Sequence, residues 1–181
     1  MDELQGQLLI GAPSIFDPNF RKTVVLMAKH DDEGAMGVVL NRPLDTTVGE
    51  AAPQLSDIVD PEERIYYGGP VQPTALVVLA EFHDPADAAL TVLGDIGFVA
   101  VGTDLADAAD LTRRARVFAG HSGWDATQLE AEMERDDWIV ERALREDVFS
   151  ADAEELWTNV LERKGGEFAF MARMPFDPSL N

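Results

Sequence analysis

The feature that most constrains the fold is a pair of apolar segments separated by a short polar turn. Residues 23–29 read TVVLMAK, and residues 35–40 read AMGVVL. β-Branched and apolar side chains dominate both segments, which is typical of buried strands. The five residues between them, HDDEG, are polar and include a glycine, so the spacing predicts a β-hairpin. The hairpin indicates antiparallel pairing in the first part of the sheet.

The rest of the chain mixes short strands with helices. Further strands are predicted at residues 7–11, 64–67, 75–81, 97–102, 115–119, 138–140 and 168–174. Helices are predicted over residues 48–55 (broken by a proline), 104–111, 126–135 and 153–164. The predicted fold class is therefore α/β in the broad sense, or α+β. In it a mixed, largely antiparallel β-sheet is flanked by helices, in a three-layer αβα-like arrangement.

The length of 181 residues suits one domain, or one domain with a small inserted subdomain. The stretch at 83–91, rich in Pro, Asp and Ala, is the best candidate boundary. The apolar runs are far shorter than the roughly 20 residues of a membrane helix, and the acidic N-terminus lacks the basic region of a signal peptide. We therefore expect a cytoplasmic protein that does not associate with a membrane.

Charge and cysteine content narrow the chemistry further. The chain has no cysteine, which excludes disulfides, thiol catalysis and cysteine-based zinc sites. Fourteen Lys and Arg residues stand against 34 Asp and Glu residues, giving a net charge of −20. A field of this sign opposes the approach of DNA, so direct nucleic-acid binding is not expected.

The segment FAGHSGWDATQLE, which begins at Phe118, resembles the start of an esterase nucleophile elbow around Ser122. That elbow needs the pattern G-x-S-x-G and a histidine later in the chain. Here Trp124 occupies the position of the second glycine, and no histidine follows Ser122. We therefore predict that Ser122 is not a catalytic serine, and no catalytic residue is assigned. We expect a structural turn between a strand and a helix, in which Gly120 and Gly123 take backbone angles closed to other residues.

The same segment carries the signals of a helix start. Asp125 is positioned as the N-cap, and Gln128 three residues later completes a capping-box pattern. Trp124 and Leu129 have the spacing of a hydrophobic staple. An anion could also bind at such a helix start, but the carboxylate of Asp125 would occupy the same amides.

Other polar clusters give weaker signals. His30, Asp31 and Asp32 could contribute to a metal site, but such a cluster is more often a hairpin turn, so no metal and no cofactor are predicted. Gly68, Gly69 and Pro70 predict a sharp turn, since no Lys-Ser/Thr pair follows as in a phosphate loop. Each of these readings rests on local sequence alone.

Four stretches together resemble the YqgE/AlgH family. They are GQLLIGAPSIFDPNFRKTVVLMAKHDDEGAMGVVLNRPL, IYYGGPVQP, RVFAGHSGWDATQLEAEMERDDWIV and MPFDPSLN, and they follow one another in the family's order over most of the chain. The chain departs from the family at His121, where tyrosine is frequent, and at Asp125, where a small residue is usual. The resemblance implies a bacterial cytosolic protein of mixed α/β architecture and no known reaction. One branch of the family is described as a transcriptional regulator, which implies an indirect regulatory role here.

The resemblance also implies a set of candidate ligand-binding residues. These positions match the family's motifs: His30, Asn41, Gly68, Gly69, Pro70, Gly120, Gly123, Trp124, Gln128 and Glu130.

Two hypotheses about function remain open, together with direct DNA binding, which the charge disfavours. The first is a non-enzymatic binding or regulatory module that contacts an unknown protein or small molecule and could form a homo-oligomer. The second is a hydrolase or transferase that uses His30 or His121 as an acid or base.

Overall fold

The computed structural model describes residues 4–174. Within these residues, ten strands form one sheet in the order β10-β1-β2-β3-β9-β6-β8-β7, and β4 and β5 attach to it beside β9. Every strand pair is antiparallel except β5 with β9. The strands are β1 (Gln7–Gly11), β2 (Val24–Asp31), β3 (Gly34–Val39), β4 (Pro43–Thr47), β5 (Arg64–Tyr67), β6 (Val71–Phe82), β7 (Leu90–Leu93), β8 (Ile96–Phe98), β9 (Thr112–Asp125) and β10 (Trp138–Arg142).

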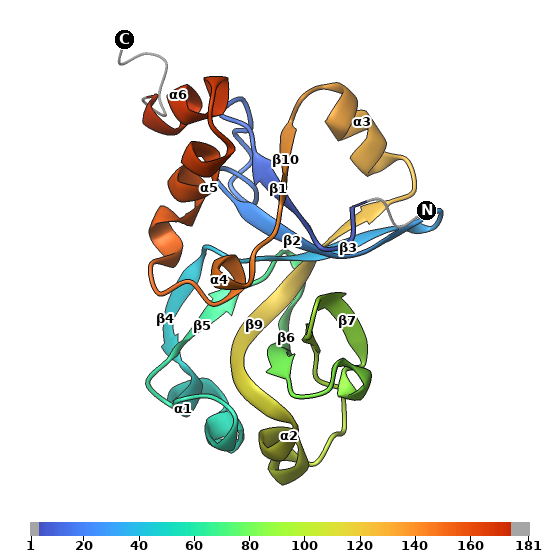
Figure 1. The fold of residues 1–181 in the computed structure, drawn as a ribbon, viewed down its shortest axis with the longest axis vertical. Coiled ribbons are helices and arrows are strands. Elements are labelled where there is room, and N and C mark those ends of the chain that lie inside the picture. The colour runs from blue at the N-terminus through green and yellow to red at the C-terminus, as the bar shows by residue number, and fades with distance from the viewer. Residues whose placement is uncertain (1–3, 175–181) are drawn as a thin grey trace.

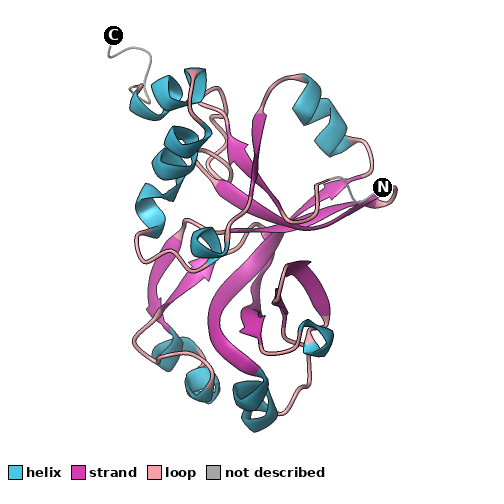
Figure 2. Ribbon diagram, in the orientation of Figure 1, coloured by secondary structure: helices cyan, strands magenta, loops and turns pink. Residues whose placement is uncertain are grey.

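Helices are short and lie around the sheet (Figure 2). They are α1 (Val48–Ala51), α2 (Leu105–Leu111), α3 (Gln128–Glu134), α4 (Arg145–Val148), α5 (Leu156–Lys164) and α6 (Glu167–Arg173), with 3-10 turns η1 (Pro53–Asp57), η2 (Pro85–Asp87) and η3 (Ala153–Glu155). The predicted α+β class is confirmed. No helix within residues 4–174 has the length and apolar character that crossing a bilayer requires.

Strands β1, β2 and β3 are covered by helices on both faces, which explains their continuous apolar sequence. Successive side chains of a strand point to opposite faces, so neighbours enter different cores. Leu8 packs in one core with Trp157 of α5, whereas Leu9 packs in another with Leu129 of α3. Figure 1 shows α5 and α3 on opposite sides of these strands. This part of the molecule therefore has the predicted helix–sheet–helix layers.

Strand β9 joins this layered half to the other half of the molecule (Figure 1). Its last four residues pair with β3, whereas residues 112–121 pair with β6 along most of their length. A third neighbour, β5, runs parallel to it at Phe118 and Ala119. A third core lies on one face of this second half, where α1 and η1 bring Val48 and Leu55 against Val117 of β9. One strand thus contributes to both halves.

The strand predicted at residues 168–174 is wrong, because the segment forms helix α6. Phe168, Met171 and Ala172 all pack against the core beneath α5, and their spacing of three and four residues places them on one face of a helix. The helical period of these apolar residues therefore outweighs the strand preference of the two phenylalanines in the segment.

Other strands also differ from the predictions. Strand β8 ends at Phe98, so residues 99–102 do not continue it as the GFVAVG pattern suggested. Strands β4 and β7, with five and four residues, were not predicted. Their burial patterns lack the apolar alternation of a longer strand, and the first begins with Pro43, which the sequence indicates as a strand end.

Candidate functional site

The segment around Ser122 lies inside β9 and does not form the predicted turn between a strand and a helix. Ser122 is fully buried, and its hydroxyl donates a hydrogen bond to the carbonyl oxygen of Gly68 at 3.1 Å. A buried hydroxyl with a backbone acceptor has no access to a substrate. Ser122 therefore ties β9 to the end of β5 and does not act as a nucleophile.

The predicted glycine turn is a close crossing of two backbones. Gly68 follows β5, donates its amide to Ala119 at 2.8 Å and accepts the amide of Val39 at 2.9 Å. A Cβ at Gly69 would collide with the backbone of His121, and a Cβ at Gly120 would collide with the carbonyl oxygen of Gly69. Both glycines also have positive φ angles, +150° and +73°, which glycine adopts without steric strain. These glycines therefore hold His121 and β9 against the loop before β6.

The prediction of an unusual backbone angle at Gly123 is wrong, since its φ is not positive. A Cβ at Gly123 would meet only ordinary contacts, at 3.6 Å from Val71 and 3.9 Å from Ala35.

The predicted helix start is confirmed in part. Helix α3 begins at Gln128, two residues later than predicted, yet Asp125 Oδ1 still accepts the amides of Thr127 at 3.1 Å and Gln128 at 2.8 Å. These backbone hydrogen bonds lower the pKa of Asp125. The side chain of Gln128 donates to Glu132 at 3.3 Å and does not complete a capping box. Asp125 thus stabilises the helix start without its predicted partner.

Trp124 belongs to an aromatic cluster that is built around the carboxylate of Glu132. The indole N–H groups of Trp124 and Trp138 each donate to Glu132 Oε2 at 2.8 Å. Phe20 stacks on Trp124 with ring centroids 6.0 Å apart and packs edge-on against Trp138 at 5.5 Å. Trp124 and Leu129 are buried in the same core, as the staple spacing predicts. The cluster fixes α3 to the sheet.

His30 and Asn41 do not lie together. Asn41 Oδ1 accepts the amide of Val24 at 2.9 Å, and its Nδ2 donates to the carbonyl of Lys22 at 2.8 Å, so it binds the start of β2. His30 stands six residues along that strand, about 20 Å away at 3.3 Å per residue. Its Nδ1 is buried without a hydrogen-bond partner in the described part of the chain. Asp31 Oδ1 accepts the amide of Glu33 at 2.9 Å, which is a hairpin-turn contact.

The remaining candidates lie on the surface. Pro70, Gln128 and Glu130 are exposed. A ligand role for the ten candidate residues stays a prediction, and the structure brings together Gly68, Gly69, Pro70 and Gly120 beside His121.

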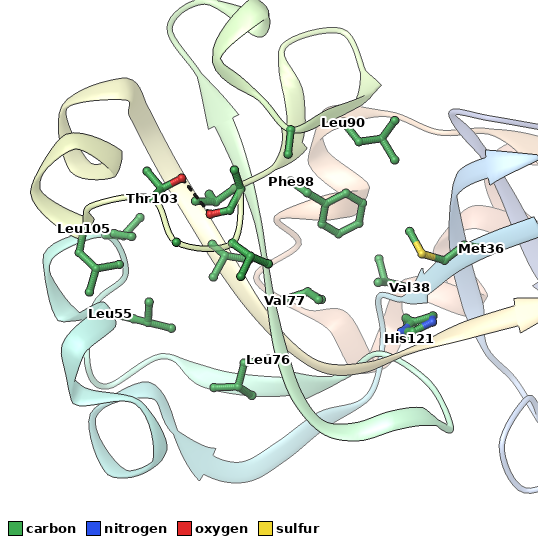
Figure 3. A pocket seen from close by; sticks show the side chains of 17 residues that line it. Met36, Val38, Leu55, Leu76, Val77, Leu90, Phe98, Thr103, Leu105 and His121 are labelled. Carbon is green, nitrogen blue, oxygen red and sulfur yellow. Dashed lines mark hydrogen bonds between the residues drawn. The ribbon is translucent and has the colours of Figure 1, made fainter.

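A cavity of about 450 Å³ lies on the other side of this crossing, between β3, β6, β8 and the segment that leads into α2 (Figure 3). Its wall is almost entirely apolar. The lining residues are Met36, Val38, Leu55, Ile58, Leu76, Val77, Val78, Ala89, Leu90, Phe98, Val99, Ala100, Val101, Gly102, Thr103, Leu105 and His121. None of the ten candidates lines it, but the glycine crossing supports its wall at His121.

His121 is the one titratable side chain among the described residues of this wall. It is partly buried, and this burial lowers the pKa of the imidazole. No described residue makes a hydrogen bond with the ring, so its donor and its acceptor are both without a partner in the described part of the chain. Thr103, which carries the wall's one hydroxyl, donates it to the carbonyl of Ala100 at 2.8 Å. The cavity thus offers apolar contact and one neutral imidazole.

Replacing His121 with glutamine should make the melting temperature less sensitive to mild acid. Burial lowers the pKa in the folded protein, so the unfolded chain takes up the proton first as pH falls. The stabilisation from the neutral imidazole is complete above the unfolded pKa of about 6.5 and is lost as pH falls through the folded pKa. Between about pH 7.5 and pH 5, the melting temperature should fall further for the wild type than for His121→Gln.

The exposed His83 provides the control. His83→Gln should keep the wild-type dependence on pH, and a His121→Gln protein with that same dependence would contradict the prediction.

Little in the local sequence pattern indicates this cavity. Its lining comes mainly from β3, η1, β6, β7, β8, β9, the loop before α2 and the start of α2, segments that span residues 36–121. From the sequence, His121 is a candidate only as an acid or base. One usable signal was the apolar character of residues 99–102, which continue past the end of β8 and place Val101 fully exposed at the cavity.

The sheet is mainly antiparallel. Helices cover both of its faces in one half of the molecule, and in the other half it lines an apolar cavity, so the fold defines an α+β class of protein. A family model described as AlgH-like matches residues 8–169. The chain therefore belongs to the AlgH-like family, and the resemblance to YqgE/AlgH proteins is confirmed. Residues 175–181, on which the C-terminal stretch of that resemblance mostly rests, lie outside the described residues.

Relatives and solved structures agree with this assignment. The chain is 39% identical over 181 residues to a UPF0301 protein of Mycobacteroides abscessus (97% of this chain, 87% of the relative). It is 41% identical over 189 residues to a UPF0301 protein of Thermobifida fusca (98% and 96%). A crystal structure from Corynebacterium diphtheriae has a TM-score of 0.85 at 26% identity (94% and 92%). The solution structure of AlgH from Pseudomonas aeruginosa has a TM-score of 0.74 at 30% identity (95% and 94%).

Proposed function

We propose that the protein is a non-enzymatic binding module that takes a small, largely apolar ligand into the cavity beside His121. The single observation that carries this proposal is the wall itself, apolar throughout except for a neutral imidazole and a hydroxyl bonded within its own loop. The volume of about 450 Å³ is within the range of roughly 300–1,000 Å³ that small-molecule sites occupy. Binding energy would come from the apolar contacts, and His121 would orient a polar group of the ligand.

An indirect regulatory role fits this site. The net charge of −20 opposes direct contact with DNA, so an effect on transcription would pass through the bound ligand or a protein partner. A protein partner, a homo-oligomer and a cytoplasmic location stay predictions. Catalysis by His121 is less favoured, because the hydroxyl of Thr103 is already bonded and no second titratable group lines the described wall.

Methyl NMR with labelled methionine can locate binding directly. Met36 lines the cavity, whereas Met133 and Met171 lie elsewhere in the fold. We expect indole or a medium-chain alcohol to shift the Met36 methyl signal in a saturable way and to leave the other two unchanged. A panel of such probes that never moves the Met36 signal would remove the proposal.

A tryptophan at the cavity should block this binding. Leu76 lines the cavity and is 39% exposed, so Leu76→Trp can fill its opening at little cost to folding. Leu144 is equally exposed, at 39%, and lies outside the cavity wall, so Leu144→Trp is the matched control. Calorimetric titration with the best probe should show at least about a tenfold loss of affinity for Leu76→Trp, or about 1.4 kcal/mol. Equal affinities for the two variants would place the ligand elsewhere.

A further inference from the structure

A second hollow of about 320 Å³ lies beside β9. We call it the arginine notch. Its lining residues are Ile58, Val59, Asp60, Glu63, Arg113, Arg114, Ala115, Arg116 and Phe149. Three of the 14 basic residues of the chain thus line one small hollow in a protein of net charge −20. The notch shares only Ile58 with the apolar cavity, so the two sites can be tested separately.

Arg116 is the most unusual member of the notch. Its side chain is 8% exposed, and no carboxylate in the described part of the chain forms an ion pair with it. One nitrogen, Nη1, donates to the carbonyls of Ser150 at 3.0 Å and Val148 at 3.3 Å, and Cζ lies 4.4 Å from the ring centroid of Tyr66. Burial lowers the pKa of Arg116, which reflects the energetic penalty on its charge. The carboxylate of Glu63 offsets part of this penalty without pairing with the guanidinium, and a buried charge without a paired counter-ion is costly.

The other edge of this guanidinium has no assigned role in the fold. Nε and Nη2 of Arg116 make no hydrogen bond with any described residue. These two nitrogens form a planar fork whose parallel N–H groups match the oxygens of a carboxylate or a phosphate. Tethering of Nη1 to two carbonyls fixes the direction of the fork, so the entropy of ordering it is already lost.

The neighbouring arginines differ in how far they are neutralised. Arg113 Nη1 is bound to Asp95 at 3.0 Å and to the carbonyl of Phe82 at 3.2 Å. Arg114 uses only Nε, which donates to Glu81 at 2.8 Å, while its Cζ lies 4.3 Å from the ring centroid of Phe149. The two terminal nitrogens of Arg114 therefore have no hydrogen-bond partner among residues 4–174 and remain available beside Arg116.

Two carboxylates on the opposite side of the notch set its selectivity. Asp60 and Glu63 line it, and neither forms an ion pair with Arg114 or Arg116. Asp60 Oδ1 accepts the amide of Glu62 at 2.9 Å, and the exposed Glu63 has no side-chain hydrogen bond among the described residues. Their negative charges repel an entering anion, which restricts the notch to a group that can use the fork of Arg116.

We infer that the arginine notch binds an oxyanion group, a carboxylate or a phosphate, of a small molecule, with the Nε–Nη2 edge of Arg116 as the main contact and Arg114 as the second. Repulsion by Glu63 lowers the affinity, so the free inorganic ion binds weakly and a ligand with more contacts binds more tightly. This site is separate from the proposed apolar site, and either can fail without the other.

NMR spectra of the arginine Nε–H groups test the inference on the intact protein. Sodium acetate and sodium phosphate are titrated separately at constant ionic strength, with sodium chloride as the reference. We expect a saturable shift of the Arg116 signal with at least one of the two salts, at a Kd in the millimolar range. The salt that produces it identifies the carboxylate or the phosphate as the recognised group. A shift that is absent, or equal to that with chloride, would overturn the inference.

Variants separate the fork from general charge. Arg116→Lys keeps a charge that can still donate to the carbonyls of Val148 and Ser150 but removes the fork, so affinity should fall at least about tenfold. Glu63→Gln removes a repelling charge and should tighten binding of the anion about three- to fivefold. This test uses a protein that keeps Arg116, so its result does not depend on whether Arg116→Lys folds. Arg135→Gln is the control, because Arg135 is exposed and paired with Asp137 at 2.6 Å away from the notch. Unchanged affinity in Glu63→Gln would contradict the inference even if Arg116→Lys failed to fold.

Discussion

Gly69→Ala should lower the free energy of unfolding by about 3–5 kcal/mol. The added Cβ would collide with the carbonyl carbon and oxygen of His121 and with the amide of Ser122. These are backbone atoms in a paired strand, which cannot rotate away as a side chain can. The φ angle of +150° adds strain of its own, because alanine rarely adopts it.

The matched control is Gly94→Ala. Gly94 also has a positive φ, +58°, but an added Cβ would meet no atom within 4 Å. In this variant the free energy of unfolding should therefore fall only by the energetic cost of the backbone angle, about 1 kcal/mol. Comparing the free energies of unfolding of the two variants in urea separates the cost of the steric collision from the cost of the backbone angle. If Gly69→Ala were no less stable than Gly94→Ala, the close crossing of the two backbones would be wrong.

Glu132→Ala should lower the free energy of unfolding by about 2–5 kcal/mol. The change removes the acceptor of two indole N–H groups, on tryptophans that are each 5% exposed. A buried donor that loses its partner costs about 1–3 kcal/mol. Glu132→Gln should lose less, because its carbonyl oxygen can still accept both N–H groups. Urea unfolding followed by tryptophan fluorescence measures the difference.

The control for this prediction is Glu130→Ala, which lies on the same helix. Glu130 is exposed and makes no side-chain hydrogen bond among the described residues, so stability should stay within about 0.5 kcal/mol of the wild type. The third tryptophan, Trp157, donates to the carbonyl of Gly11 at 2.8 Å, so neither substitution changes its hydrogen bond. A Glu132→Ala protein as stable as Glu130→Ala would show that the shared acceptor does not matter.

The strands that could be predicted are those whose side chains alone decide their structure. The TVVLMAK and AMGVVL segments become β2 and β3 because both of their faces are buried, which leaves few polar residues to blur the pattern. Residues 64–67 are followed by two glycines that end the strand, and they form β5 over the predicted range. By contrast, Phe168 and Met171 lie on a helix whose apolar face is set by contact with α5. The same short apolar segment is also compatible with a strand, so the sequence pattern alone does not decide between the two.

The candidate site was harder to predict because it depends on which segments cross. Gly120 and the residues after it look like a turn, since glycine and Asp125 favour turns locally. Pairing with β3 and β6 extends β9 through this segment, and the positive φ of Gly120 becomes a bend within a strand. The cavity and the notch depend on residues far apart in the chain, such as Met36 with His121 and Glu63 with Arg116.

The continuity of β9 has a consequence for how the molecule comes apart. Its 14 residues hydrogen-bond to β3 at one end and to β6 along the other, with the bend at Gly120 between them. Opening either half would break the ladder of a strand that the other half needs, so we expect the two halves to unfold as one cooperative unit. A molecule bound in the cavity would then protect the distant aromatic cluster from unfolding as much as it protects its own binding site.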